Sequence, residues 1–331
     1  MTWFESLVGF PESQPDQVRK NLSVSGETLA SHVNGREFIC GRLETPSLAE
    51  LRARVKSTPA RRGRIAVLEV VADVQDLHTN VANAGSLFQV ASQFNLLEMV
   101  SPSVTPERGV GIYERDFTQG PACAIAAGAG TIYRNYFAPT NGQIGQSRDN
   151  QVDCLRDLGE ELGNTDARLW RMSNGYALAS RSGLNEISDL LRTADDRQLD
   201  ALRSRLRIGL QWQTQVTLQG ASHLVSQAYC SALPVAYSAH PTERWQGFAK
   251  LVLEASYEAT MCAAILNARN EGNHRVFLTL LGGGAFGNGT EWIIGSMRRA
   301  LKLHDGAGLE VVVVSYGTSD QHVRGLVQEF S

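Results

Sequence analysis

A glycine-rich loop in the last third of this 331-residue chain has the clearest potential for chemistry. The apolar run from Arg275 to Leu281 leads into GGGAFGN, and a helical pattern follows from Thr290 to Leu303. Glycines let backbone N–H groups approach a phosphate without interference from Cβ atoms, and a helix N-terminus adds unpaired donors. A tight turn whose glycines serve packing is the alternative. The residues expected to bind a diphosphate are Gly283, Gly284, Ala285, Phe286, Gly287 and Asn288.

This loop differs from two common nucleotide-binding motifs. Asn288 and Gly289 stand where G-x-x-x-x-G-K-[ST] needs a lysine and a hydroxyl residue to reach terminal phosphates and Mg²⁺. No acidic residue follows on a second strand at the distance that a dinucleotide fold requires. The loop therefore predicts binding through backbone groups, with no metal and no cofactor.

A second loop, NVANAGS at Asn80 to Ser86, follows the apolar run from Arg64 to Val71. A V-x-N-A-x core after one strand, paired with a distant G-G-G-x-F-G loop after another, resembles the macrodomain family. In that family the first loop holds the distal ribose of ADP-ribose and the second holds the diphosphate. The resemblance implies a ribose contact from three residues of this loop, Asn80, Asn83 and Ala84.

The resemblance extends over about residues 64–315 and leaves two parts of the chain without a counterpart, the first 60 residues and a helical insertion. The G-D-I-T opening of the family is absent. Asp73 or Asp76 would take over the adenine contact that the family makes with an aspartate. The implied ligand is ADP-ribose, carried by a modified protein substrate.

Three acidic residues are candidates for the hydrolytic chemistry of such a site. Poly(ADP-ribose) glycohydrolases, which belong to the wider family, follow the ribose loop with a catalytic glutamate, and Glu98 stands in a similar place. Cleavage of an ADP-ribosyl bond passes through an oxocarbenium-like state, so a carboxylate is needed to activate water or protonate the leaving group. The glycine-rich stretch and paired glutamates of those enzymes are missing. A solvated helix end is the alternative for Glu98.

Asp116 and Glu107 lie in the polar segment after Glu98. This arrangement resembles the arginine-specific macrodomain hydrolases of bacterial effector systems, which use several acidic side chains and no metal. Such acids suit an arginine substrate, because carboxylates hold a guanidinium through paired hydrogen bonds. The alternatives are an Asx-turn cap for Asp116 and an exposed loop charge for Glu107. The nearby Tyr133, Arg134 and Tyr136 have two equal interpretations, namely contact with the ligand or target protein and packing in the core or at the surface.

The pattern of apolar residues predicts a three-layer α/β/α domain with a mixed sheet. Unbroken apolarity in 64–71 predicts a central strand buried on both faces, and spacings of three and four from Gly85 predict a helix. Further strands are expected at 110–114, 122–127, 131–136, 209–218, 225–237, 275–281 and 309–314, with helices at about 242–270 and 290–303. Ser47 is expected to cap a short helix.

The chain is therefore divided into an N-terminal extension (1–60) and a catalytic domain (61–331), with a mainly helical insertion at about 150–207 that contains a strand at 169–178. The net charge of −3 gives no general attraction to nucleic acid or to an anionic membrane. Five widely spaced cysteines and the absence of a signal-peptide pattern predict a cytoplasmic protein, or one delivered into a host cytosol.

The sequence favours an ADP-ribosyl hydrolase that removes ADP-ribose from protein side chains, above all arginine. A reader module that binds ADP-ribose without cleaving it would need the same two loops and no placed carboxylates. A phosphate-binding α/β protein of unrelated chemistry is the third hypothesis.

Overall fold

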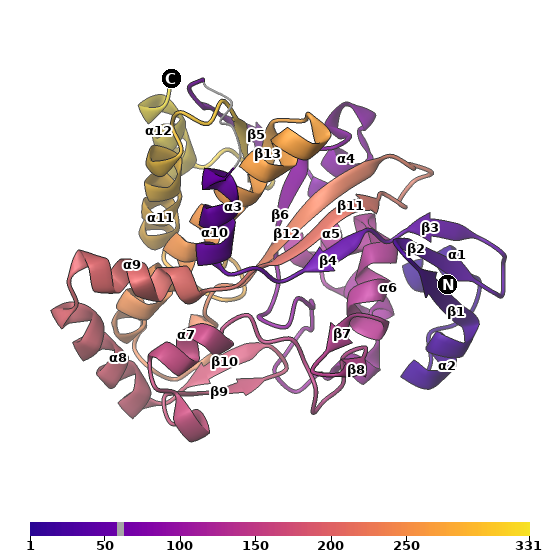
Figure 1. The fold of residues 1–331 in the computed structure, drawn as a ribbon, viewed down its shortest axis with the longest axis horizontal. Coiled ribbons are helices and arrows are strands. Elements are labelled where there is room, and N and C mark those ends of the chain that lie inside the picture. The colour runs from indigo at the N-terminus through magenta and orange to yellow at the C-terminus, as the bar shows by residue number, and fades with distance from the viewer. Residues whose placement is uncertain (58–62) are drawn as a thin grey trace.

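A seven-stranded mixed sheet forms the centre of the computed structural model, which describes residues 1–57 and 63–331 (Figure 1). In spatial order the strands are β4 (Arg42–Glu44), β11 (Gly209–Gln215), β12 (Leu224–Cys230), β6 (Leu87–Ala91), β13 (Arg275–Leu278), β14 (Glu310–Ser315) and β5 (Ala66–Val71). The five strands from β12 to β5 are parallel, and β11 is antiparallel to both of its neighbours. The carboxyl ends of five strands therefore meet at one edge of the sheet.

Helices cover both faces of the sheet, which confirms the expected three-layer architecture. Successive side chains of a strand point to opposite faces. On β6, Gln89 donates a 2.9 Å hydrogen bond to Thr260, whereas the Phe88 ring stacks 3.8 Å from His78 on the other side. The first face carries α3 (Leu48–Lys56), α10 (Gln246–Glu271), α11 (Thr290–Leu303) and α12 (Gln321–Glu329), and the second carries α4 (Val74–Thr79), α5 (Gln119–Ala126) and α6 (Gly128–Tyr136).

The N-terminal segment adds a small layer beside α6 and one strand, β4, to the main sheet (Figure 1). Its own apolar cluster packs around Phe4, Val18 and Leu29. Ser47 caps α3 in a reciprocal capping box with Glu50, as expected. The expected boundary between residues 60 and 61 lies outside the described residues. The segment contains α1 (Trp3–Val8), α2 (Pro15–Asn21), β1 (Leu22–Ser25), β2 (Thr28–Ser31) and β3 (Glu37–Ile39).

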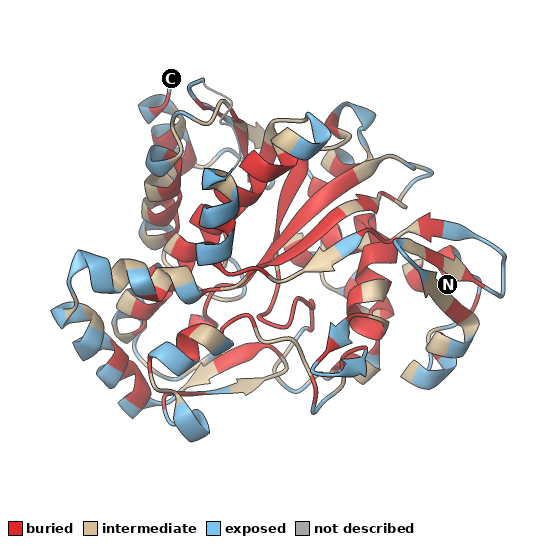
Figure 2. Ribbon diagram, viewed as in Figure 1, coloured by how far each residue is buried: buried red, intermediate tan, exposed pale blue. Residues whose placement is uncertain are grey.

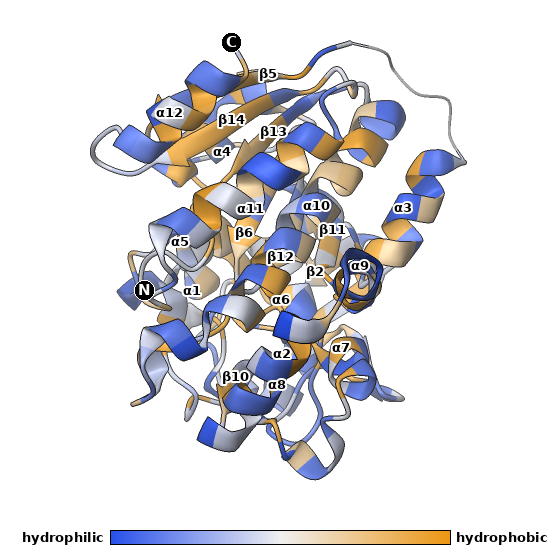
Figure 3. Ribbon diagram, turned by 90° about the vertical axis from the view of Figure 1, so that its left-hand side faces the viewer, coloured by the Kyte–Doolittle hydropathy of each residue, from blue (hydrophilic) through white to orange (hydrophobic). Residues whose placement is uncertain are grey.

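The expected helical insertion lies below the sheet in Figure 1 and packs its last two helices on α10. The strand predicted at 169–178 is a tight hairpin. These helices have hydrophilic outer faces, whereas the strands of the main sheet are hydrophobic (Figure 3). The elements of the insertion are α7 (Arg156–Glu161), β9 (Trp170–Ser173), β10 (Tyr176–Ala179), α8 (Arg181–Thr193) and α9 (Asp196–Arg205). Two short strands, β7 (Pro139–Thr140) and β8 (Gln143–Ile144), precede it.

From residue 209 onward the chain agrees closely with the sequence patterns. The helices α10 and α11 and the strands β11, β13 and β14 form where they were predicted, and α11 has the predicted bounds. The strand predicted at 225–237 ends at Cys230 and is followed by a one-turn helix at Val235–Tyr237. No helix in the described residues combines the length and apolarity that crossing a bilayer would require.

The helix predicted from Gly85 is wrong, because Leu87–Ala91 is β6, a central strand whose first four residues are buried (Figure 2). The polar Gln89 interrupts an otherwise apolar run and makes it look amphipathic. Its side chain is nevertheless buried and paired, with its amide donating to Thr260 and its oxygen accepting from the Thr279 N–H. Conversely, the predicted central strand at 64–71 is β5, which lies at the sheet edge with several exposed side chains.

The strands predicted between 110 and 136 are also wrong. This segment forms a short 3₁₀ helix, Gly111–Arg115, followed by α5 and α6. Its glycines were interpreted as turns, but they permit close helix packing. A Cβ atom on Gly120 would collide with the carbonyl oxygen of Ala91, and one on Gly130 would meet Thr214 at 2.7 Å. Small residues therefore bring α5 and α6 directly against the sheet.

Candidate functional site

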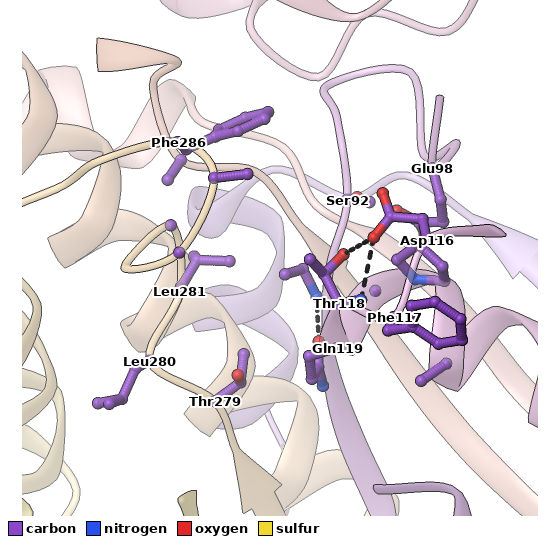
Figure 4. A pocket seen from close by; sticks show the side chains of 18 of the residues that line it. Ser92, Glu98, Asp116, Phe117, Thr118, Gln119, Thr279, Leu280, Leu281 and Phe286 are labelled. Carbon is purple, nitrogen blue, oxygen red and sulfur yellow. Dashed lines mark hydrogen bonds between the residues drawn. The ribbon is translucent and has the colours of Figure 1, made fainter. Parts of the chain in front are cut away.

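A cavity of about 390 Å³ opens at the carboxyl edge of the parallel strands (Figure 4). This is the edge at which open α/β sheets bind ligands, and the volume falls within the range of small-molecule sites. Its walls come from the ends of β5, β6, β13 and β14, from the start of α5, and from the glycine loop. Tyr176 of the insertion hairpin and Tyr237 close one side.

The glycine loop forms one wall of this cavity, as expected from the sequence. Gly284, Ala285 and Phe286 line it, and within the described residues their backbone N–H groups donate to no protein acceptor. Gly284 has open space where a Cβ atom would project. Three adjacent free donors are suited to an anion such as a phosphate.

Three other loop residues expected to bind the ligand shape the loop instead. Gly287 has a φ of 69°, and a Cβ there would meet Ala236 at 2.9 Å. Asn288 is buried and donates to the Leu233 carbonyl at 2.9 Å. Neither residue lines the cavity, nor does Gly283, and the first turn of α11 is also absent from the lining. The donors come from the loop rather than from the helix N-terminus.

Glu98 lies on the wall opposite the glycine loop (Figure 4). Its side chain is 2% exposed, and its Oε1 atom has no hydrogen-bond partner within the described residues. Burial raises the pKa of this carboxyl to about 8, against an ordinary value of 4.5. A carboxyl group that keeps its proton at neutral pH is suited to general acid catalysis.

Asp116 lies beside Glu98 on the same wall (Figure 4). Its Oδ1 atom accepts hydrogen bonds from the Thr118 N–H at 2.9 Å and the Thr118 hydroxyl at 2.7 Å. The Asx turn and the cavity position therefore occur together, although they were considered as alternatives. The Asp116 carboxylate adds to the effect of burial on the Glu98 pKa.

Glu107 is not part of the cavity lining, so the expectation of a third acid beside the other two is wrong. Its Oε1 atom accepts a 2.7 Å hydrogen bond from the Arg148 N–H. Partial burial raises the pKa of this carboxyl, but hydrogen bonds from Thr105 and Arg148 outweigh it and lower the pKa overall. Glu107 thus fastens its loop to the segment before the insertion.

The NVANAGS loop lies at the opposite edge of the sheet, because it precedes β6 rather than following a buried strand. None of Asn80, Asn83 and Ala84 lines the cavity. Asn83 is buried, accepts a 2.8 Å hydrogen bond from Arg275 and donates to the Leu77 carbonyl at 2.8 Å. The structure therefore corrects the expected pairing of the two loops.

Of the two aspartates considered for adenine, only Asp73 lines the cavity. It follows β5 and caps α4 through a 2.8 Å hydrogen bond from the Gln75 N–H. Asp76 lies within α4, outside the lining.

Apart from Phe286, the aromatic residues around the cavity were not recognised from the sequence. Tyr176, Tyr237 and Phe286 form a cluster with ring centroids 5.1–5.6 Å apart. Phe117 and Tyr316 are 89% and 77% exposed at the rim. Tyr176 belongs to the insertion, so no local pattern could assign it to the site, whereas Phe117 directly follows Asp116 in the polar segment.

Gln119 is a further residue that the sequence analysis missed. Its side-chain oxygen accepts from the Ala91 N–H at 2.9 Å, and its amide donates to the Gln89 carbonyl at 2.8 Å. These two bonds hold the start of α5 against the end of β6. The walls carrying Glu98 and Asp116 are thereby fixed to the sheet.

Comparisons with known proteins give weak likenesses. No family model matches the chain, and no curated protein matches its sequence. Its structure is similar to a poly(ADP-ribose) glycohydrolase from Thermomonospora curvata, with 12% identity, a TM-score of 0.48 and 96% of each chain covered. The same protein bound to the inhibitor ADP-HPD gives 11% identity and a TM-score of 0.43, with 95% of this chain and 96% of the other covered. A poly(ADP-ribose) glycohydrolase from Deinococcus radiodurans in complex with ADP-ribose gives 13% identity and a TM-score of 0.45, with 87% and 92% covered. At these identities the likenesses do not define the activity of this chain.

Proposed function

We propose that this protein hydrolyses ADP-ribose from modified protein side chains, most favourably from arginine. The observation that carries the proposal is the pairing of two opposed walls. One presents three free backbone N–H groups at Gly284 to Phe286, and the other presents the unpartnered, proton-retaining carboxyl of Glu98. Such a cavity suits a ligand with a diphosphate at one end and a scissile glycosidic bond at the other.

In the proposed reaction Glu98 acts first as an acid. The bond between the anomeric carbon and the guanidino nitrogen breaks, its electron pair stays on nitrogen, and that nitrogen takes the Glu98 proton. Water then attacks the oxocarbenium-like carbon and gives a proton back to the Glu98 carboxylate. The products are free ADP-ribose and an unmodified guanidinium, and the enzyme returns to its starting protonation state.

Asp116 supplies the negative charge that favours arginine. Its carboxylate lies beside Glu98 and keeps one oxygen, Oδ2, out of the Asx turn. That oxygen is available for a charge-assisted hydrogen bond to the departing guanidinium. Glutamate and serine leaving groups carry no positive charge and gain nothing from this contact.

Isothermal titration with ADP-ribose tests the binding half of the proposal. Gly284→Glu projects a charged side chain into the open space of the loop, so we expect loss of binding with an unchanged melting temperature. Gly295→Glu is the matched control, because Gly295 has open space around it on α11 and does not line the cavity. Absence of ADP-ribose binding by the wild type would overturn the proposal.

Turnover separates hydrolysis from simple binding. The wild type and Glu98→Gln are compared on arginine-, glutamate- and serine-linked ADP-ribosyl peptides. We expect Glu98→Gln to bind ADP-ribose normally and to lose about 10²- to 10⁴-fold in kcat, the usual contribution of a general acid. Binding without turnover of any linkage by the wild type would identify a reader module instead.

A further inference from the structure

Arg134 on α6 is a buried cation without an ion-pair partner. Its side chain is 1% exposed, and within the described residues no carboxylate oxygen lies within 4.0 Å of its nitrogens. Taking a guanidinium out of water is costly unless the charge is compensated. A side chain that only packed at this position would not need the positive charge of a guanidinium.

The contacts of Arg134 are neutral and direct it toward the loop that carries Glu98. Its Nε atom donates to the Leu96 carbonyl at 3.2 Å, and Nη2 donates to the Thr131 hydroxyl at 2.9 Å. The guanidinium lies 3.6 Å from the centre of the Tyr229 ring. Its remaining terminal nitrogen, Nη1, is buried and has no partner.

Glu98 has the complementary deficiency, since its Oε1 atom is a buried acceptor without a partner. Arg134 binds the Leu96 carbonyl, two residues before Glu98, and its charge acts on the Glu98 carboxyl. An unpaired donor and an unpaired acceptor therefore lie within electrostatic range of each other. Unsatisfied buried polar atoms are rare in folded proteins and call for an explanation.

We propose that Arg134 is a positioning residue that compensates the charge of Glu98 whenever this carboxyl gives up its proton. In its acid form Glu98 needs no counter-charge. After proton donation it becomes a buried carboxylate, and Arg134 then supplies the only facing positive charge among the described residues. The inference rests on the role of Glu98 in the proposed function.

The other groups that face Glu98 do not change this account. Asp116 at the end of the 3₁₀ helix is an acid and disfavours the Glu98 carboxylate. The remaining facing groups are neutral below pH 9, because burial raises the pKa of each. They are Tyr113 on the same 3₁₀ helix, Cys123 on α5, Tyr176 on β10 and Tyr229 on β12.

Carbon-13 NMR of protein labelled at the glutamate side-chain carboxyl tests the inference without an activity readout. The Glu98 signal is assigned by its loss in Glu98→Gln, and its titration is compared in wild type, Arg134→Gln and Arg134→Lys. We expect a midpoint near pH 8 in the wild type, a rise of at least about one unit in Arg134→Gln, and a midpoint close to wild type in Arg134→Lys. An unchanged midpoint in Arg134→Gln would overturn the inference.

A folding defect in Arg134→Gln is resolved by making the same substitution in Glu98→Gln. Recovery of a folded double variant at alkaline pH, where Glu98 is ionised, supports charge compensation, because the carboxylate that needed Arg134 is gone. Continued unfolding shows that Arg134 is structural and overturns the inference. ADP-ribose titration of the wild type reports separately on the proposed function, so the two failures are distinguishable.

Discussion

The hydroxyl of Tyr176 donates a 2.6 Å hydrogen bond to the carbonyl oxygen of Met99, the residue that follows Glu98. Close by in the same hairpin, Asn174 donates to the Pro102 carbonyl at 2.7 Å, and the Gly175 carbonyl accepts from the Phe94 N–H at 3.0 Å. The insertion therefore holds both ends of the segment that carries the proposed acid. Because the Tyr176 ring also contacts Phe286, the same residue connects the two walls of the cavity.

Tyr176→Phe removes this hydrogen bond and keeps the ring. We expect the free energy of unfolding to fall by about 1 kcal/mol, the usual net value of one buried hydrogen bond. We expect kcat to fall about tenfold, because the Glu98 segment loses part of its support. Denaturant unfolding and hydrolysis of an arginine-linked peptide measure the two effects. Tyr133→Phe is the control, since Tyr133 does not line the cavity and its hydroxyl makes no hydrogen bond among the described residues, and an equal loss of kcat there would contradict the assignment.

Glu98→Gln is expected to stabilise the protein in a pH-dependent way. The folded pKa of Glu98 is about 8 against an ordinary value of 4.5, so folding favours the protonated form. The destabilisation by Glu98 is absent below pH 4.5, grows as the pH rises toward 8, and is constant above that. At pH 7 the variant gains up to about 3 kcal/mol relative to wild type, and at pH 4 nothing. Thermal unfolding of both proteins from pH 4 to pH 9 measures this difference, and a constant difference across that range would contradict a raised pKa.

The last third of the chain could be predicted from sequence because local pattern and tertiary environment agree there. The strand before Gly282, the loop with positive φ at Gly282 and Gly287, and the predicted bounds of α11 all follow from local composition. Gln89 and Gly120 illustrate the opposite case. Gln89 made a central strand look amphipathic, because the residues that bond its side chain are distant in sequence. Gly120 was interpreted as part of a turn, although it is needed for close contact with Ala91.

The candidate site shows the same division. Glu98, Asp116 and the middle of the glycine loop were found because their residue types fit the chemistry, and the cavity brings them together. Asn83 was predicted at the cavity, but it lies at the other edge of the sheet. The edge that a loop reaches depends on the order of the strands, which local sequence does not reveal. Tyr176 and Arg134 were not assigned, because only long-range contacts bring them near Glu98.

Asp116→Asn tests the second acid while keeping the turn, because an asparagine oxygen still accepts from Thr118. Loss of the negative charge lowers the pKa of Glu98, so the alkaline limb of the pH–rate profile moves to lower pH. We expect kcat/KM for an arginine-linked peptide to fall about 10- to 100-fold, corresponding to one charge-assisted hydrogen bond. Binding of free ADP-ribose should not change. A fall of the same size on a serine-linked peptide would show that Asp116 does not select for guanidinium.

Gly120→Ala tests the close packing of α5 on the sheet. The added methyl group collides with the Ala91 carbonyl and comes within 2.9 Å of the Glu98 carboxyl. We expect a loss of about 1–3 kcal/mol in the free energy of unfolding, as for other overpacked sites. Gly295→Ala on α11 is the matched control, since its methyl group meets nothing within 4 Å, and we expect a gain of up to about 1 kcal/mol. Equal effects of the two substitutions would show that helix propensity, rather than contact with β6, decides the outcome.

Asn83→Ala distinguishes the observed position of the NVANAGS loop from a role in ribose binding. The substitution leaves the Arg275 Nη1 donor and the Leu77 carbonyl without their 2.8 Å partners, so we expect a loss of about 1–3 kcal/mol in stability. Because the loop lies at the amino end of β6 and the cavity lies at its carboxyl end, the Kd for ADP-ribose should stay within about twofold of wild type. Gly284→Glu should behave in the opposite way, with stability retained and binding lost. Loss of ADP-ribose binding in a folded Asn83→Ala variant would instead place the ribose site at the amino edge of the sheet, away from Glu98.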